Sequence, residues 1–244
     1  MAAERIEPAA GAIAERLTRV RDRIADASAR AGRDAAAVRL VVVTKDVDVR
    51  RAAEALAAGA TDLGENRARE FTAKIDALAG EAPQPRWHFI GTLQRNKIKT
   101  VVGAAGLIHS VDSIALGRAV AARAHALGIA QDVLLEVNVS GEASKHGLEP
   151  AATAEALGSL AGEEGIRVRG LMTIAPAGAP SVARRAFSDL RDLRDALRGT
   201  LGGADLDELS MGMTSDFEQA VEEGATIVRV GTAIFGARVD QRRL

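Results

Sequence analysis

A lysine stands at the end of a short apolar run near the start of the chain. The run Leu40–Thr44 reads Leu-Val-Val-Val-Thr and is followed at once by Lys45. Partial burial disfavours the charged form of an amine and therefore lowers the pKa of a lysine toward neutrality. A neutral amine can form an imine with an aldehyde or a ketone. From its position alone, Lys45 is either such a nucleophile or a solvated residue at a strand end.

Two segments nearer the C-terminus have the composition of a phosphate site. Met211–Asp216 reads Met-Gly-Met-Thr-Ser-Asp, and Gly231–Thr232 supplies a second glycine and a further hydroxyl. We expect one helix to begin near Thr214 or Ser215 and another at Ala233, and free N–H groups at helix starts bind anions. The threonines could equally cap these helices, because capping uses the same N–H groups. A phosphate cradle and a lysine amine together suit a phosphorylated aldehyde.

The elements that would position these groups alternate along the chain. Short runs of β-type composition occur at 40–44, 61–63, 87–90, 107–111, 133–137, 168–172, 209–211 and 227–230. Helical patterns lie between them, so eight strands separated by seven helices indicate parallel βαβ units. The length and the strand count favour a closed (β/α)₈ TIM barrel over an open sheet.

Apolar residues also repeat at steps of three and four over Ile13–Ile24, which predicts a helix before the first strand that ends near Gly32. After Val230 the chain is too short for a full eighth helix. We therefore expect the N-terminal helix to cover the face that this helix would leave bare. No Pro- or Ser-rich linker divides the chain, so we expect a single domain over residues 1–244.

Active sites of such barrels lie at the C-terminal ends of the strands. The polar rim expected there comprises Lys45, Asn66, Gly91, Asp112, Asn138, Thr173 and the segments 211–214 and 229–232. Carboxylates on this rim do not form an obvious glycosidase pair. The four histidines lack metal-ligand spacing, and we interpret His88 and His109 as structural residues of strands and His125 as solvated.

The composition excludes several classes of function. A net charge of −1 gives no general attraction to nucleic acid or to anionic lipid. No run approaches the roughly 18 apolar residues of a membrane span, and the first residues are polar. The chain contains no cysteine. We expect a cytoplasmic protein that binds neither nucleic acid nor membranes.

Several segments taken together resemble one family, the pyridoxal phosphate homeostasis proteins. They are VVVTK, DLGENRARE, WHFIGTLQRNK, IHSVDS, LLEVNVSGEASKHGL, RGLMTIAP and LSMGMTSDFEQAVEEGATIVRVGTAIFG. The resemblance covers nearly the whole chain. It implies a single barrel similar to the N-terminal domain of alanine racemase, which is a fold-type III pyridoxal phosphate barrel.

The resemblance also implies a set of cofactor contacts. Pyridoxal 5'-phosphate (PLP) is expected as a Schiff base on Lys45, and its phosphate is expected at Thr214, Gly231 and Thr232. Arg229 is expected near the ring nitrogen or the phosphate. The remaining expected contacts are Asn66 and Met211.

Two segments depart from the family pattern. Asp46-Val47-Asp48 stands where Thr-Lys-Pro is common, and Gly91-Thr92-Leu93-Gln94 where Gly-His-Leu-Gln is common. Roles for a second lysine or a histidine at these sites are therefore in doubt. Lys145, beside His146 in the loop after the fifth strand, is either a solvated residue or a transient acceptor of the cofactor. Arg95, Lys97 and Lys99 are either a solvated helix face or an accessory contact.

The resemblance implies a protein that holds PLP reversibly and supplies it to PLP-dependent apo-enzymes. The alternative is a PLP-dependent amino-acid racemase or decarboxylase. Alanine racemase uses a lysine and a tyrosine from a second domain as its two bases, and this chain has no tyrosine. An always-charged arginine at the ring nitrogen also weakens the cofactor as an electron sink. A Schiff-base aldolase would need an acid–base partner that we do not identify. We therefore expect a monomeric, non-catalytic carrier, with a weak side activity left open.

Overall fold

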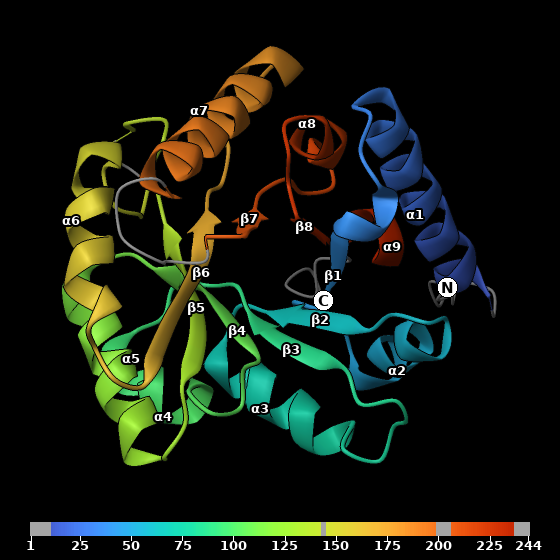
Figure 1. Cartoon of the computed structure of the whole chain (residues 1–244). Helices are drawn as coiled ribbons and strands as arrows, with labels where there is room; N and C mark the ends of the chain where they lie inside the picture. Colours follow the sequence, from blue (N-terminus) through green and yellow to red (C-terminus); the bar gives the residue numbers. More distant parts are fainter. Residues whose placement is uncertain (1–10, 143–144, 199–205, 237–244) are drawn as a thin grey trace, which may run out of the picture.

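The computed structural model describes residues 11–142, 145–198 and 206–236, which fold as a closed barrel of parallel strands (Figure 1). The strands are β1 (Arg39–Val43), β2 (Asp62–Glu65), β3 (Arg86–Phe89), β4 (Leu107–Val111), β5 (Gln131–Glu136), β6 (Ile166–Met172), β7 (Glu208–Ser210) and β8 (Ile227–Val230). Each strand pairs with the next, and β8 pairs with β1 to close the ring. The predicted barrel is confirmed, and each predicted strand end lies within two residues of the observed one.

Helices connect successive strands and surround the barrel (Figure 1). They are α2 (Val49–Ala57), α3 (Ala68–Ala77), α4 (Ile98–Val101), α5 (Ile114–Ala126), α6 (Pro150–Ala161), α7 (Pro180–Arg198) and α8 (Phe217–Glu222). Helix α1 (Ala12–Arg30) precedes the barrel, and the short α9 (Thr232–Phe235) follows β8. Two 3₁₀ turns, η1 (Ala35–Ala37) and η2 (Arg95–Lys97), complete the described elements. None of the described helices is long and apolar enough to cross a membrane.

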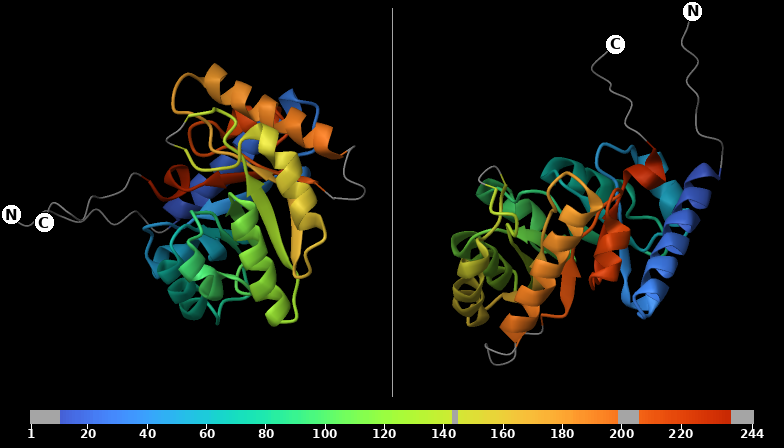
Figure 2. Two further views of the ribbon diagram at one scale, coloured as in Figure 1. Left: turned by 90° about the vertical axis from the view of Figure 1, so that its left-hand side faces the viewer. Right: turned by 90° about the horizontal axis from the view of Figure 1, so that it is seen from above.

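Helix α1 closes the side of the barrel on which α9 is short. It packs on α8, α9 and α2, and Figure 2 shows it beside the C-terminal elements in red. Its apolar face is buried, with Leu17 and Ala27 fully inaccessible to solvent. The expectation that the N-terminal helix covers this face is therefore confirmed.

Two junctions between a helix and the following strand have the same construction. Gly59 (φ 88°) ends α2 and Gly224 (φ 101°) ends α8, both in the left-handed region that glycine adopts without strain. After each glycine the chain turns back, with Ala60 N–H donating to Ala55 O and Ala225 N–H donating to Ala220 O. These short turns lead directly into β2 and β8, and so fix where the ends of those strands lie.

The barrel has two apolar layers. The larger layer lies mainly between the strands and the helices and contains alternate strand residues such as Val42, Val228 and Val230. A smaller, separate cluster consists of Val41, Leu107, Leu134, Met172 and Ile227, one each from β1, β4, β5, β6 and β8. Since successive side chains of a strand point to opposite faces, the smaller cluster is the interior of the barrel. Arg229, two residues after Ile227, points to the same interior.

Candidate cofactor site

A cavity of about 1600 Å³ opens at the C-terminal ends of the strands. Six of the residues predicted to contact a cofactor line it: Lys45, Asn66, Thr214, Arg229, Gly231 and Thr232. They come from the ends of β1, β2, β7 and β8, which the barrel brings together although 187 positions separate the first from the last. The position expected for an active site of this fold is therefore hollow and polar.

Met211 is the exception among the predicted contacts. Its side chain is fully buried in the layer between strands and helices and does not line the cavity. The chain then turns at Gly212, which has a φ of 89°, and Met213 lines the cavity instead. Strand β7 ends at Ser210, before the turn, and a contact between Met211 and the cofactor stays a prediction.

Lys45 lies in a turn rather than at the last position of a strand. Strand β1 ends at Val43, and Val47 N–H donates to Thr44 O at 2.9 Å to close the turn. Asp46 has a φ of 59°, which aspartate tolerates better than most residues. The Lys45 side chain is half-buried, and its amine has no hydrogen bond or ion pair with the described residues.

The Asp46-Val47-Asp48 departure has local roles in the structure. Asp46 adopts the left-handed conformation of the turn and accepts a hydrogen bond from Arg67 at 2.9 Å. Asp48 caps α2, since its Oδ1 accepts the N–H of Arg51 at 2.9 Å. The two aspartates therefore hold the chain within the turn and directly after it, on the C-terminal side of Lys45.

A buried ion pair lies directly below the residues of the cavity. Lys74 of α3 donates to the Glu65 carboxylate and, at 2.5 Å, to the carbonyl oxygen of Thr44. The Thr44 hydroxyl donates to the same carboxylate at 2.8 Å. Glu65 and Thr44 are fully buried, and Lys74 is 5% exposed. Because Thr44 precedes Lys45 and Glu65 precedes Asn66, this pair joins the two strand ends from which these residues extend.

Asn66 carries a free acceptor. Its Oδ1 atom is buried and has no hydrogen-bond partner among the described residues. The loop after β3 approaches it closely, since a Cβ on Gly91 would lie 2.2 Å from the Asn66 carbonyl oxygen. A buried polar atom without a partner is costly in a folded protein, so Asn66 fits a ligand that donates a hydrogen bond.

The phosphate cradle is partly as predicted. Helix α9 begins at Thr232, but α8 begins only at Phe217, later than expected, because Asp216 accepts the N–H of Met213 at 2.6 Å and holds the segment in a turn. Within the described part of the chain, the backbone N–H groups of Thr214, Ser215, Gly231 and Thr232 donate to no protein acceptor. Four N–H groups without partners at one side of a cavity suit an anion.

Thr214 caps helix α9 rather than α8, the helix that follows it in the chain. Its hydroxyl oxygen accepts the N–H of Ala233, the second residue of α9, at 3.3 Å. Gly231 allows β8 to pass close to β1, since a Cβ there would lie 3.0 Å from the Val43 carbonyl oxygen. A side chain at Gly231 would therefore press on the end of β1, the strand that precedes Lys45, rather than project only into the cavity.

Arg229 is a buried cation at the floor of the cavity. It is 4% exposed, donating from Nη1 to Ser210 Oγ at 2.5 Å and from Nη2 to Thr173 O at 2.9 Å. Burial lowers its pKa to about 10, although the carboxylates of Glu136 and Asp216 oppose this shift. The guanidinium therefore keeps its charge at neutral pH.

Glu136 was not among the predicted cofactor contacts, although its place at the end of β5 could have indicated it. It lines the cavity while only 7% exposed. Burial, and then the nearby charge of Asp112, raise the pKa of its carboxyl, and Arg229 opposes this rise. The cavity therefore holds a carboxyl group that is harder to ionise than usual.

The other candidates divide between the cavity and the surface. Lys145 and His146 line the cavity, and the Lys145 amine lies 3.6 Å from Glu142 and 3.4 Å from Ile174 O. Residues 143–144 of the same loop are outside the described residues. His125 is exposed and pairs with Glu164 at 3.2 Å. Arg95, Lys97 and Lys99 are exposed and do not line the cavity, which matches a solvated face.

His88 and His109 are buried and hydrogen-bonded, as interpreted. His88 Nε2 lies 2.9 Å from Asp62 Oδ1, and His88 Nδ1 lies 2.9 Å from His109 Nε2. His109 Nδ1 also lies 2.8 Å from Ser210 Oγ, and the same oxygen accepts a hydrogen bond from the Arg229 guanidinium. The sequence did not indicate this contact.

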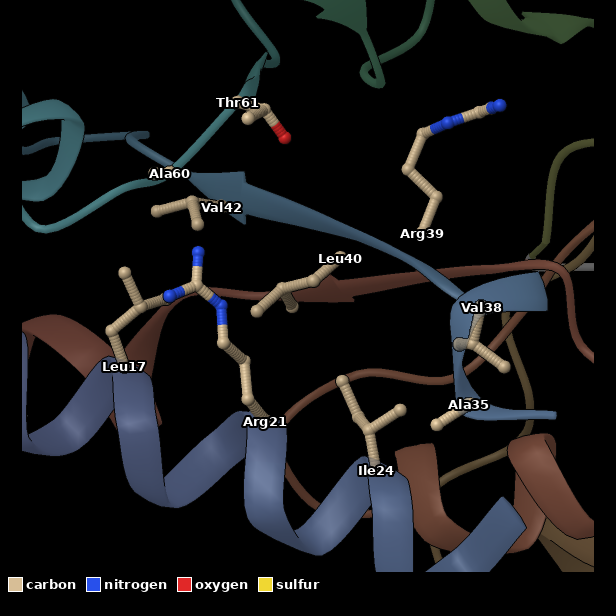
Figure 3. Close-up of a pocket in the computed structure, with 10 residues that line it drawn as sticks. All are labelled: Leu17, Arg21, Ile24, Ala35, Val38, Arg39, Leu40, Val42, Ala60 and Thr61. Atoms are coloured by element: carbon tan, nitrogen blue, oxygen red, sulfur yellow. The ribbon is translucent and has the colours of Figure 1, made fainter.

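A second, smaller cavity of about 290 Å³ lies at the opposite end of the barrel, between α1 and β1 (Figure 3). Both of its arginines have partners: Arg21 donates to the carbonyl oxygens of Ala58 and Gly59, and Arg39 donates to Glu208 at 3.0 Å. Figure 3 shows the Arg39 side chain directed away from α1. The candidate site is therefore the larger cavity at the C-terminal ends of the strands.

The fold is that of a known class of barrel domain. The family described as "Alanine racemase, N-terminal domain" matches residues 16–239. The structure of PipY from Synechococcus elongatus PCC7942 without PLP is 37% identical, with a TM-score of 0.84 over 92% of this chain and 100% of that chain. The structure of PipY with PLP bound is 36% identical, with a TM-score of 0.82 and the same coverage.

Curated relatives make the assignment more particular. The pyridoxal phosphate homeostasis protein of Aquifex aeolicus is 45% identical over 225 residues, which are 92% of this chain and 97% of the relative. The protein of the same name from Pseudomonas aeruginosa is 44% identical over 230 residues, which are 93% and 96% of the two chains. The chain belongs to the family of pyridoxal phosphate homeostasis proteins.

The residues present in this chain fit PLP. Lys45 offers an amine and Asn66 a buried acceptor, and neither has a partner in the part of the chain that the structure describes. The four N–H groups named above, with the hydroxyls of Thr214 and Thr232, match a phosphate dianion. Arg229 supplies a fixed positive charge at the floor.

Proposed function

We propose that this protein binds PLP in the cavity at the C-terminal end of the barrel and acts in intracellular PLP homeostasis. Lys45 carries the cofactor as a Schiff base, and the segments around Thr214 and Gly231–Thr232 hold its phosphate. The proposal rests mainly on one observation: a lysine amine and a set of backbone N–H groups line the same cavity, and none of them has a partner among the described residues. The sequence relation to PipY, whose structure has been solved with PLP bound, supports it.

The chain's own residues divide the work of binding. The bound cofactor supplies an aldehyde carbon for an amine and a conjugated ring that absorbs visible light. The ion pair of Lys74 and Glu65 keeps the two strand ends together, so that Lys45 and Asn66 face the same ligand. The N–H groups hold the phosphate without a cluster of cations, which favours reversible binding because hydrogen bonds alone are modest in net energy.

The experiment is a titration with PLP followed by absorbance and equilibrium dialysis. Wild type should develop a visible absorption band and bind saturably, and Lys45→Ala should lose the band. Lys97→Ala, at an exposed residue outside the cavity, is the matched control and should behave as wild type. If the wild-type protein showed no saturable binding of PLP, the proposal would be refuted.

We further propose that the protein is a cytoplasmic, monomeric carrier that delivers PLP to apo-enzymes and does not turn over amino acids. The absence of tyrosine from the sequence supports this, as does a charged arginine at the floor of the cavity. The alternative is an amino-acid racemase or decarboxylase.

The loaded protein should restore activity to an apo-enzyme, and it should elute as a monomer on size-exclusion chromatography. Incubation with L- and D-amino acids in deuterated water separates the two functions. A carrier should leave the Cα proton in place. Rapid exchange that disappears in Lys45→Ala would favour the enzyme.

A further inference from the structure

A chain of buried hydrogen bonds runs through the barrel interior from Arg229 to Asp62. Arg229 Nη1 lies 2.5 Å from Ser210 Oγ, which lies 2.8 Å from His109 Nδ1. His109 Nε2 lies 2.9 Å from His88 Nδ1, and His88 Nε2 lies 2.9 Å from Asp62 Oδ1. The five residues stand on β8, β7, β4, β3 and β2 and are at most 7% exposed. We call this set the relay.

The chemistry of the two end residues, Arg229 and Asp62, fixes which atom is the donor in each hydrogen bond of the relay. A guanidinium can only donate hydrogen bonds, so Ser210 Oγ accepts from Arg229. The serine hydroxyl must then donate its own hydrogen, and among the described residues its other neighbour is His109 Nδ1. His109 therefore carries its proton on Nε2 and donates to His88 Nδ1.

At the other end, a carboxylate can only accept, so His88 donates from Nε2 to Asp62. Both rings are then neutral and carry their proton on Nε2. Burial lowers the pKa of His88 and takes the pKa of His109 well below 6.5, which agrees with two neutral rings. Every hydrogen bond of the relay thus points from Arg229 toward Asp62.

Asp62 is itself fixed. Its Oδ2 accepts from the Thr61 hydroxyl at 2.8 Å, and Arg39 lies 3.7 Å from its Oδ1. Arg39 in turn donates to Glu208 at 3.0 Å. The far end of the relay is therefore held by residues at the N-terminal end of the barrel, away from the cavity.

The Arg229 end is the one that depends on the relay. The guanidinium nitrogens contact two neutral acceptors, Ser210 Oγ and Thr173 O. A buried cation needs satisfied hydrogen bonds. The Ser210 hydroxyl donates its hydrogen to His109, so its oxygen stays in one position and accepts from Arg229 there. If the relay only filled space, apolar residues such as those of the Val41 and Leu107 cluster would serve the interior equally well.

We propose that Ser210, His109 and His88 are positioning residues of the cofactor site, which act through Arg229 by fixing its guanidinium at the floor of the cavity. This inference rests on the proposed function, because it requires the cofactor to bind beside Arg229. His88 and His109 do not line the cavity themselves. They influence the cofactor from inside the barrel, through Ser210.

The test compares Ser210→Ala, which removes both the acceptor for Arg229 and the donor to His109, with Ser210→Thr, which keeps a hydroxyl. His125→Asn changes an exposed histidine and is the control. Ser210→Ala should weaken PLP binding about tenfold or more and change the ratio of the absorption bands of bound PLP. Ser210→Thr should restore the wild-type band ratio. A folded Ser210→Ala protein with the affinity and spectrum of wild type would overturn the inference.

A second measurement needs no variant. Nitrogen NMR of ¹⁵N-histidine in the wild-type protein should show His88 and His109 as neutral rings protonated on Nε2. Adding PLP should shift the His109 signals and leave those of His125 unchanged. A charged ring, a proton on Nδ1, or His109 signals unmoved by PLP would overturn the inference. If wild type did not bind PLP at all, the proposed function would fail first, and the titration distinguishes that case.

Discussion

The two sides of Arg229 contrast in how their polar groups are satisfied. Toward the cavity, the Lys45 amine, Asn66 Oδ1 and the N–H groups around Thr214 and Gly231 have no partners among the described residues. Toward the barrel interior, each polar group of the relay has a partner within 3 Å. A rigid interior must satisfy its own polar atoms, whereas a binding site leaves them for its ligand. The difference supports our proposal that the ligand binds on the cavity side of Arg229.

The largest effect should come from the support beneath the cavity. Lys74→Met leaves the buried Glu65 carboxylate without its cation, which should lower the free energy of unfolding by about 3–5 kcal/mol. Urea unfolding measures this. The exposed Lys97→Met is the control and should change stability by less than about 0.5 kcal/mol.

The double variant Glu65→Leu, Lys74→Met sharpens this test. Replacing both partners removes the uncompensated charge, so the double variant should be more stable than Lys74→Met alone. A Lys74→Met protein as stable as wild type would mean that the pair does not support the cavity.

The next largest effect should be on binding rather than on folding. The double variant Thr214→Val, Thr232→Val removes two hydroxyls that face the proposed phosphate. Losing one hydrogen bond to a charged group costs about 1.5–3 kcal/mol, so PLP affinity should fall about tenfold to a hundredfold for each hydroxyl removed. Stability should fall by about 1 kcal/mol, because Thr214 also caps Ala233.

Thr72→Val is the matched control for this pair. Thr72 lies on α3, and its hydroxyl contacts backbone carbonyls of its own helix. PLP affinity should remain at the wild-type value in this variant. An affinity unchanged in the Thr214, Thr232 double variant would place the phosphate elsewhere.

A further effect, spread over a range of pH, should distinguish the barrel interior from the cavity. The unfolded chain protonates its histidines as the pH falls through 6.5, whereas burial keeps His88 and His109 neutral in the folded state. The unfolded state then binds more protons, so stability falls as the pH falls below 6.5. Each histidine should contribute a slope of up to about 1.4 kcal/mol per pH unit.

Urea unfolding at several pH values between 7 and 5 measures this slope. His109→Asn should reduce the slope, and His125→Asn, at an exposed residue, should leave it unchanged. The lowered pKa of Asp62 adds a further loss only at more acidic pH, below about 4. Stability that did not change between pH 7 and 5 would contradict two buried neutral histidines.

The sequence predicted the features that are local. Glycine at position 32 marked the end of the N-terminal helix, and the apolar runs marked the strands. Lys45 and the segments after β7 and β8 were indicated because barrel sites lie at strand ends, and the resemblance assigned their roles. These features depend on a few neighbouring residues, so a single sequence contains the information.

Features that depend on register across the barrel were not predicted. His109 and Ser210 are 101 positions apart, and they meet because each points into the interior at the same level. Lys74 reaches Thr44 across 30 positions. The late start of α8 depends on one hydrogen bond, from Met213 N–H to Asp216, that a capping pattern does not reveal. The same turn explains why Met213, rather than Met211, lines the cavity.

One measurement tests the central claim most directly. The PLP-loaded protein is treated with borohydride, which fixes a Schiff base permanently, and is then digested and mapped by mass spectrometry. The account predicts one modified residue, Lys45, and no fixed cofactor in Lys45→Ala. Cofactor fixed on Lys145 or on another lysine, or fixed equally well in Lys45→Ala, would contradict the account.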